Sequence, residues 1–266
     1  MRSSLAMMLL GATLSSATFA AGAPAAAPGT GAAGAYSTSA ATGAQGDTWS
    51  SIATLPDWKG VWELDYRSGG LAAMRPLPPK LTPEYQARLD KYHEGQKHGE
   101  NEQNDTANCN PPGMPQIMTQ PYPVEFLFTP GKVTVAIEAY SQMRRIFTDG
   151  RKHPADPDPT YQGHSIGHWE GDTLVIDTVG FIPTSLIAMG VGHSEQMRIV
   201  ERIRKVSPDT MQISTTIIDP KVLQEPWTVT RPYKRHTDWD MQEYVCAQNN
   251  RDSADAQGRA GMNLTR

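Results

Sequence analysis

Short alternating runs of apolar and polar residues recur along the second half of the sequence, and most runs end at a turn signal. Alternation with a period of two places the apolar side chains of a run on one face of a β-strand. Pro130-Gly131 separates the first two runs, and Ser207-Pro-Asp-Thr210 separates two of the last ones. The runs cover residues 124–129, 132–138, 142–148, 163–169, 172–179, 197–206, 211–218 and 227–235, after an opening strand at 57–65. This pattern predicts an all-β fold of eight or nine short antiparallel strands, a meander that forms a barrel or a two-sheet sandwich.

One segment before these strands has the pattern of a helix. Thr82 is a candidate N-cap, Pro83 occupies the first helical position, and Gly95 marks the end. Apolar side chains recur at i, i+4 and i+7, at Tyr85, Leu89 and Tyr92. This spacing predicts one short helix that docks one face on the rest of the protein.

The first 21 residues have the features of a secretory signal peptide. Arg2 provides the positive charge, and the apolar run from Leu5 to Phe19 is too short to span a bilayer. Residues 22–48 are rich in Ala, Gly, Ser and Thr, a composition typical of a disordered tether. We therefore expect a single β domain at 49–250, a flexible tail at 251–266, and a mature protein that is periplasmic or secreted.

Charge and motifs narrow the classes of partner. The formal net charge of −4 comes without a basic stripe, so a nucleic-acid partner is not expected. No later run has the apolar length of a transmembrane helix, so we expect no membrane insertion. No glycine-rich phosphate loop is present, and no cofactor is expected. The expected partner is a small-molecule ligand or substrate, and the sequence leaves the oligomeric state open.

The chain has two cysteines, Cys109 and Cys246, both in polar surroundings rich in Asn. Neither belongs to a Cys-x-x-Cys pair, which argues against a metal site. In an exported protein the two are expected to form one disulfide, which in the chain-entropy model stabilises the fold by about 3–5 kcal/mol.

The segment 163–178 is predicted to be a hairpin that also carries candidate chemistry. A two-residue loop at Glu170-Gly171 pairs His164 with Asp177 across the strands. One face then carries Ser165, Gly167, Trp169, Leu174 and Ile176, and the other carries His164, Ile166, His168, Thr173, Val175 and Asp177. Because a carboxylate fixes the tautomer of an imidazole and raises its basicity, His164 and Asp177 are a candidate acid–base dyad. The alternative is a solvated charge pair on the outer face.

The histidines do not form a metal-binding motif. His164 and His168 are four residues apart. On a strand that separation is roughly 13 Å, too far for one shared ion. No His-Glu-x-x-His spacing is present either, so we expect no metal site.

Two further residues are candidate catalytic groups. His193 follows the stretch 183–192, whose Gly, Ala and Met content is typical of a lid; the alternative is a solvated histidine. Glu201 shares a strand face with Ile199 and Ile203, and a carboxylate on an aliphatic face must be paired or have a raised pKa. The structural alternative is a bond from Glu201 to Arg144, Arg145 or Thr216.

Three polar side chains are candidate substrate contacts: Arg151, His168 and Arg202. Arg151 follows the turn Asp149-Gly150 and has the chemistry to pair with an anionic substrate group; the alternative is an exposed turn residue. His168 shares the strand face of His164, and Arg202 adjoins Glu201.

Gly60-Val61-Trp62, near the start of the first strand, resembles the Gly-x-Trp opening of lipocalin-like barrels. In that family the Trp closes the base of the barrel and an Arg from a late strand packs on it. The resemblance implies a lipocalin-like barrel, with Arg231 or Arg235 in that role. The helix and the long loop after the first strand depart from the simple lipocalin order.

A second resemblance covers most of the mature chain. It is carried by Asp149-Gly-Arg-Lys-His-Pro154, by 163–178, by Glu201-Arg202, and by Asp219-Pro220 with Pro226-Trp227. These segments resemble a group of uncharacterised exported bacterial proteins. The resemblance implies export and a single domain, and it implies no activity.

Two classes of function are compatible with these residues. The first is an exported, cofactor-independent enzyme that acts on a small molecule by acid–base chemistry of the lyase, isomerase or hydratase type. In this hypothesis Asp177 orients His164, Glu201 is the partner acid and His193 is a lid contact. The second is a non-catalytic periplasmic binding protein for an apolar or aromatic small ligand.

The two hypotheses differ in which face of the hairpin lies inside the barrel. Catalysis requires the face of His164 and Asp177 to be the inner one. A carrier turns Trp169, Leu174 and Ile176 inward instead.

Overall fold

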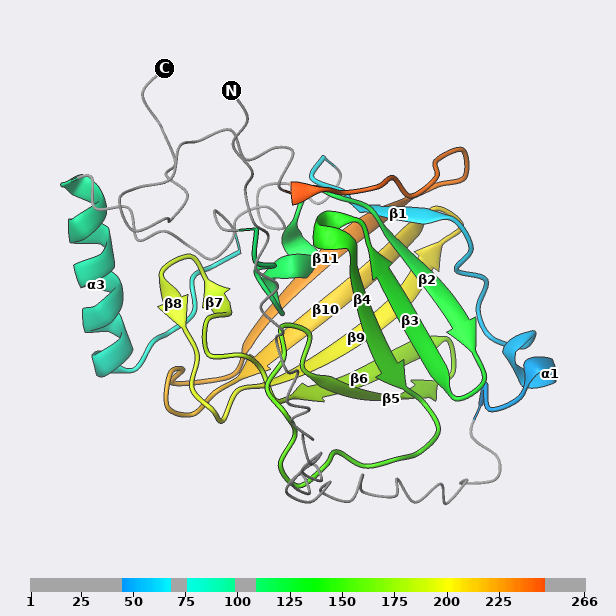
Figure 1. Ribbon diagram of the computed structural model, residues 1–266, viewed down its shortest axis with the longest axis horizontal. Coiled ribbons are helices and arrows are strands. Elements are labelled where there is room, and N and C mark those ends of the chain that lie inside the picture. Colours follow the sequence, from blue (N-terminus) through cyan, green and yellow to red (C-terminus); the bar gives the residue numbers. More distant parts are fainter. Residues whose placement is uncertain (1–44, 68–75, 99–108, 247–266) are drawn as a thin grey trace, which may run out of the picture. The chain divides into compact units, whose positions relative to one another are not determined.

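The computed structural model describes residues 45–67, 76–98 and 109–246 (Figure 1). The predicted signal peptide, most of the tether 22–48 and the tail 251–266 lie outside the described residues. Nine strands close into one barrel in the order β1-β11-β10-β9-β6-β5-β4-β3-β2. The all-β prediction is therefore confirmed, and the architecture is the barrel rather than the two-sheet sandwich.

The strands lie close to the predicted runs. They are β1 (Val61–Leu64), β2 (Val124–Thr129), β3 (Lys132–Ile137), β4 (Gln142–Phe147), β5 (His164–Glu170), β6 (Thr173–Val179), β9 (Arg198–Ser207), β10 (Thr210–Ile218) and β11 (Trp227–His236). The first strand begins later than predicted, because Asp57 accepts a turn hydrogen bond from the Lys59 N–H and Gly60 has a φ of 98°. A positive φ interrupts an extended strand.

One pair of neighbouring strands departs from the antiparallel pattern. β4 and β5 are parallel and share only two residue pairs, Ile146 with Ser165 and Phe147 with Ile166. The connection 148–163 between them is long enough to bring the chain back to the same end of the barrel, as a parallel pair requires. The ladder between β4 and β5 is therefore short, like the two-pair ladder between β1 and β2, and residues of this connection lie near the start of β5.

The predicted hairpin exists, but its register differs by two residues from the expected one. His164 pairs with Val179, and Asp177 pairs with Ile166. The loop is Gly171-Asp172 rather than Glu170-Gly171. Gly171 has a φ of 62° and takes the first loop position, where a type II′ turn needs glycine. A shift of two residues keeps each side chain on its predicted face but separates His164 from Asp177 along the sheet.

The inner face of the hairpin carries Ser165, Leu174 and Ile176, which are fully buried. Trp169 packs against the same core from a partly buried position. Apolar side chains fill most of the interior of the barrel. Its members from the sheet include Trp62, Val135, Ile137, Ile146, Ile199, Ile203, Met211 and Tyr233.

The predicted helix is α3 (Pro83–Lys97), which begins at the expected proline. The Thr82 hydroxyl does not cap it, and donates instead to the Lys221 carbonyl oxygen at 2.9 Å. The helix continues past Gly95 because an interior glycine costs only about 1 kcal/mol. Leu89 and Tyr92 pack over Gly190, as the predicted docking face requires. Among the described residues, no helix is both long and apolar enough to cross a bilayer.

The stretch predicted as a lid contains a small hairpin of β7 (Leu186–Ala188) and β8 (Val191–Gly192). Three other short elements accompany the barrel: α1 (Trp49–Ile52), η2 (Gln116–Thr119) and η3 (Ala139–Ser141). The η2 turn carries Ile117 and Met118 into the core. The Tyr66 hydroxyl donates to the Thr119 carbonyl at 3.0 Å, and the Tyr233 hydroxyl donates to the Met118 carbonyl. These bonds fix η2 to the barrel.

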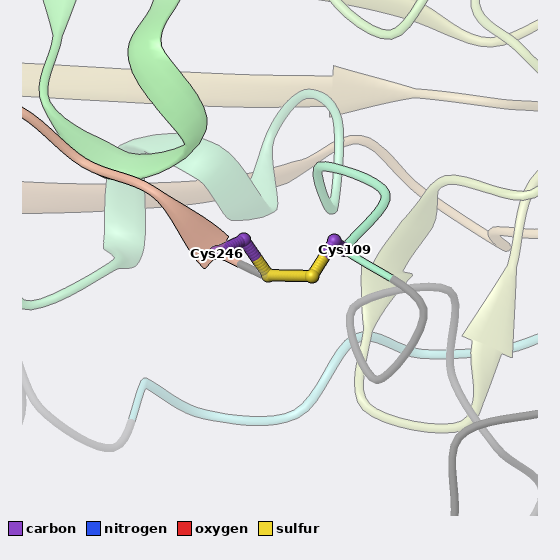
Figure 2. The surroundings of a disulfide bond; sticks show 2 residues. All are labelled: Cys109 and Cys246. Atoms are coloured by element: carbon purple, nitrogen blue, oxygen red, sulfur yellow. A yellow bond between two sulfur atoms is a disulfide. The ribbon is translucent and has the colours of Figure 1, made fainter. Parts of the chain in front are cut away.

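Cys109 and Cys246 form a disulfide, as predicted (Figure 2). Their Cα atoms are 5.5 Å apart, and the bond closes a loop of sequence separation 137. It ties the segment that leads into η2 to the chain that follows β11.

Candidate functional site

A buried ion pair lies inside the barrel. Arg144 of β4 and Glu201 of β9 are both fully buried, and the Arg144 Nη2 donates to a Glu201 carboxylate oxygen. The same guanidinium donates to the Thr178 hydroxyl at 2.9 Å and to the Ser165 hydroxyl at 3.3 Å. Alternation along the strand therefore placed Glu201 on the correct face. Of the three predicted structural partners, the structure selects Arg144.

This ion pair links two strands of the barrel wall, β4 and β9. Neither side chain is exposed to solvent, so a ligand outside the barrel does not reach the Glu201 carboxylate in this structure. Arg144 Nη1 and Glu201 Oε1 are buried without a hydrogen bond to the described residues. A single charge buried in the core without its partner is strongly destabilising, so removal of either Arg144 or Glu201 alone would leave an uncompensated charge. Glu201 thus ties β9 to β4 across the interior.

The outer face of β5 carries a second polar cluster around His164. Its Nδ1 lies 2.8 Å from the Nδ1 of His153, a residue of the 148–163 connection. The His153 Nε2 is in turn 3.6 Å from the Asp177 Oδ2. The predicted direct contact of His164 with Asp177 is therefore wrong: the two-residue register shift separates them, and the His153 ring stands between them.

The electrostatics of this cluster keep His164 neutral more readily than a solvated histidine. Partial burial lowers the pKa of His164, and the nearby His153 and Arg151 lower it further. The Asp177 carboxylate is bound by Arg198 through two hydrogen bonds of 2.7 and 2.6 Å. The two imidazoles are placed to pass a proton between their Nδ1 atoms, whereas His153 Nε2 has no hydrogen-bond partner among the described residues and faces Asp177 only as a nearby charge.

The three predicted substrate contacts do not gather at one place. Arg151 pairs with Asp149 and lies over the Phe147 ring at 3.9 Å, on the side of the sheet where Phe147 stacks on His164. His168 and Arg202 both bind Glu170, at 3.2 and 2.7 Å, and all three side chains are exposed. They form a surface cluster that makes no bond to His164 or Asp177 within the described residues.

His193 is held by the loop that carries it. Its Nδ1 is 2.7 Å from the Ser194 carbonyl oxygen, and its Nε2 is 2.9 Å from the Ile182 carbonyl oxygen. It lines a surface pocket of about 640 Å³ with Lys221 and Glu195. In the described structure it makes no bond to His164, Asp177 or Glu201, so the predicted catalytic residues lie in three separate places.

A pocket between η2, β7 and the inner faces of β10 and β11 was not predicted. Its volume is about 130 Å³. Its apolar lining comes from Pro115, Ile187, Met189, Ile217, Trp227 and Val229, and the polar side chains of Gln116 and Thr119 in η2 lie beside them. Two polar groups of the barrel strands also line it, the Thr215 hydroxyl and the Arg231 guanidinium. The sequence contained one signal for it, since alternation puts Arg231 on the same face as Val229 and Tyr233.

Arg231 makes no hydrogen bond or ion pair with a carboxylate in the part of the chain that the structure describes. Its pKa is lowered by burial, and the Tyr233 and Tyr66 hydroxyls only partly offset this effect. The expected contact of a late-strand Arg with Trp62 is made by Arg235, whose guanidinium carbon lies 5.9 Å from the Trp62 ring. Arg231 therefore lines the pocket without a carboxylate partner among the described residues.

No protein-family model matches this chain, and no curated protein matches it. Within the described ranges, no group of three or more His, Cys, Asp or Glu side chains is placed to hold a metal ion. The roles of the residues above therefore rest on geometry and chemistry.

Proposed function

We propose that this protein is an exported binding protein that takes a small organic molecule in the pocket between η2, β7 and the inner faces of β10 and β11. The observation that carries this proposal is the pocket itself, which joins apolar side chains to the Arg231 guanidinium, the Thr215 hydroxyl and the polar side chains of Gln116 and Thr119. Binding sites for small molecules combine apolar walls with a few polar groups that fix the orientation of the ligand.

The inner face of the barrel supports binding over catalysis at the hairpin. Leu174 and Ile176 are fully buried and Trp169 packs on the core, which is the arrangement that a carrier requires. The packed interior leaves the ligand a place at the edge of the core rather than at its centre. The pocket lies at that edge, between core side chains and η2.

A larger groove lies on the outward face of β10 and β11, where Gln212, Thr228 and Thr230 line it. It has a volume of about 1140 Å³, and Pro76, Trp227 and Val229 line both spaces. The Trp227 indole N–H donates to the Leu77 carbonyl at 2.9 Å, which holds the segment around Leu77 beside β11.

Export is part of the proposal. The disulfide between Cys109 and Cys246 is compatible with an oxidising compartment. The predicted signal peptide at 1–21 supports the same location. The N-terminal sequence of protein recovered from the periplasm or medium tests this, and an uncleaved N-terminus would contradict it.

The binding proposal is tested by native mass spectrometry and a ligand screen by NMR on the mature, oxidised protein. We expect bound small molecules or screen hits that are lost in Ala188→Phe, which fills the pocket from β7. Ala136→Phe on the outward face of β3 is the matched control and should keep them. Hits that survive Ala188→Phe would place binding elsewhere and would overturn the proposal.

A second candidate function is acid–base catalysis at the outer cluster of Asp177, His153 and His164. The observation that favours it is the 2.8 Å contact between two imidazoles, one of which adjoins a carboxylate. Chemical conversion of a bound ligand, followed by NMR, tests this function. His164→Gln should abolish conversion while binding at the pocket persists, and full conversion by His164→Gln would exclude this cluster.

A further inference from the structure

We infer that the pocket recognises a monocarboxylate with a short apolar body, and that Arg231 binds its carboxylate. This inference rests on the proposed binding function and names the class of ligand for the same pocket. Three observations carry it: the partners of the inward-facing arginines, the free hydroxyl beside Arg231, and the size and composition of the pocket.

Three arginines point into the barrel, and only two of them have partners among the described residues. Arg144 is neutralised by Glu201. Arg235 packs on the Trp62 ring and lies 3.7 Å from an Asp57 carboxylate oxygen. Arg231 is shielded from water to a large extent and has neither kind of partner. A cation withdrawn from water without an anion is costly, so the site favours a ligand that brings a negative charge.

The hydroxyls near Arg231 do not replace that anion. Tyr66 and Tyr233 use their hydroxyl protons on the carbonyls of η2. Thr215 lines the same pocket, and its hydroxyl makes no hydrogen bond within the described residues. The guanidinium and the Thr215 hydroxyl therefore offer donors to one ligand group. A planar carboxylate matches the fork of a guanidinium through two parallel hydrogen bonds.

The size and walls of the pocket favour a carboxylate over a phosphate. One guanidinium supplies one positive charge, whereas a phosphate at neutral pH carries about two negative charges and needs more donors. A volume of about 130 Å³ holds a head group and a few carbon atoms. The side chains of Ile187, Ile217 and Val229 provide apolar contact for those carbons. Butyrate and benzoate are therefore suitable probes.

The test is isothermal titration calorimetry of the mature oxidised protein at about pH 7.5, where carboxylic acids are ionised. The probes are benzoate, benzamide, benzylamine and inorganic phosphate. We expect benzoate to bind more tightly than benzamide, and benzylamine and phosphate to bind least. Arg231→Met removes the charge-assisted hydrogen bonds to the carboxylate, so it should weaken benzoate binding by about tenfold to a hundredfold.

The controls separate the ligand class from the binding function. Arg202→Met removes an exposed arginine from β9 and should leave benzoate affinity unchanged. If benzoate and benzamide bind equally and Arg231→Met changes neither, the carboxylate inference fails while binding at the pocket stands. If none of the probes binds, and if Ala188→Phe removes no hit in the NMR ligand screen, both proposals fail. Tightest binding of phosphate would also overturn the carboxylate inference.

Discussion

The buried pair of Arg144 and Glu201 yields the sharpest prediction on stability. In Glu201→Leu the Arg144 guanidinium keeps its two hydroxyl partners but loses its only carboxylate among the described residues. An uncompensated charge in a fully buried position costs about 3–5 kcal/mol in free energy of unfolding. We expect a comparable loss for Arg144→Met, which leaves the carboxylate alone.

The double variant Arg144→Met/Glu201→Leu should recover most of that loss. It removes both charges, and the Ser165 and Thr178 hydroxyls remain bonded to each other at 2.9 Å. Apolar replacements of a buried pair are often neutral or stabilising, by about 1–4 kcal/mol. Two single variants that are each more damaging than their combination are the signature of a coupled pair.

Urea unfolding followed by tryptophan fluorescence and circular dichroism measures these free energies. The matched control is the exposed pair Arg202 and Glu170, for which Arg202→Met should cost no more than about 1 kcal/mol. A cost below about 1 kcal/mol for Glu201→Leu, or a double variant that loses the sum of both single losses, would refute the reasoning.

Three further predictions concern the outer cluster, the disulfide and the β7–β8 turn. Since burial and His153 hold the pKa of His164 below its ordinary 6.5, the folded state binds its proton less readily than the unfolded state. The contribution of His164 to the free energy of unfolding is therefore fully present above that ordinary pKa and is lost as the pH drops through the lower pKa of the folded state. Urea unfolding at several pH values should show this decrease, and the decrease should be smaller in His164→Gln. Cys109→Ser/Cys246→Ser should lower the free energy of unfolding by about 3–5 kcal/mol, and an unchanged midpoint would contradict the estimate. Gly190→Val should lower the melting temperature, because Gly190 has a φ of 75° and an added Cβ would lie 2.5 Å from the Tyr92 ring. A Gly190→Val variant with the same melting temperature as the wild type would show that α3 does not pack there.

Most of the barrel could be predicted because each strand combines alternation with a local turn signal. Pro130-Gly131 and Pro208 lie between strands whose observed bounds differ from the predicted ones by only a residue or so. The parallel contact of β4 with β5 could not be predicted, since it depends on where the connection 148–163 returns the chain. No local pattern encodes that return.

The candidate site was harder to predict than the fold. Alternation put Glu201 inside, and the requirement that a buried carboxylate be paired named Arg144 among its partners. The direct pairing of His164 with Asp177 failed because a glycine turn can take either of two adjacent positions. His153 was missed as a neighbour of His164 because it reaches β5 through the irregular connection. The pocket at Arg231 depends on η2 and β7, which come from distant parts of the chain.

The most direct test of the central claim is an NMR chemical-shift map of the isotopically labelled mature protein titrated with benzoate. Binding in the pocket predicts saturable shifts of the Arg231 Nε–H signal and of the Ile187, Ile217 and Val229 methyl groups. It predicts little change at His168 and Arg202, which lie on the outer surface cluster. Saturable shifts confined to that outer surface, or no shifts at the pocket methyl groups, would contradict the account.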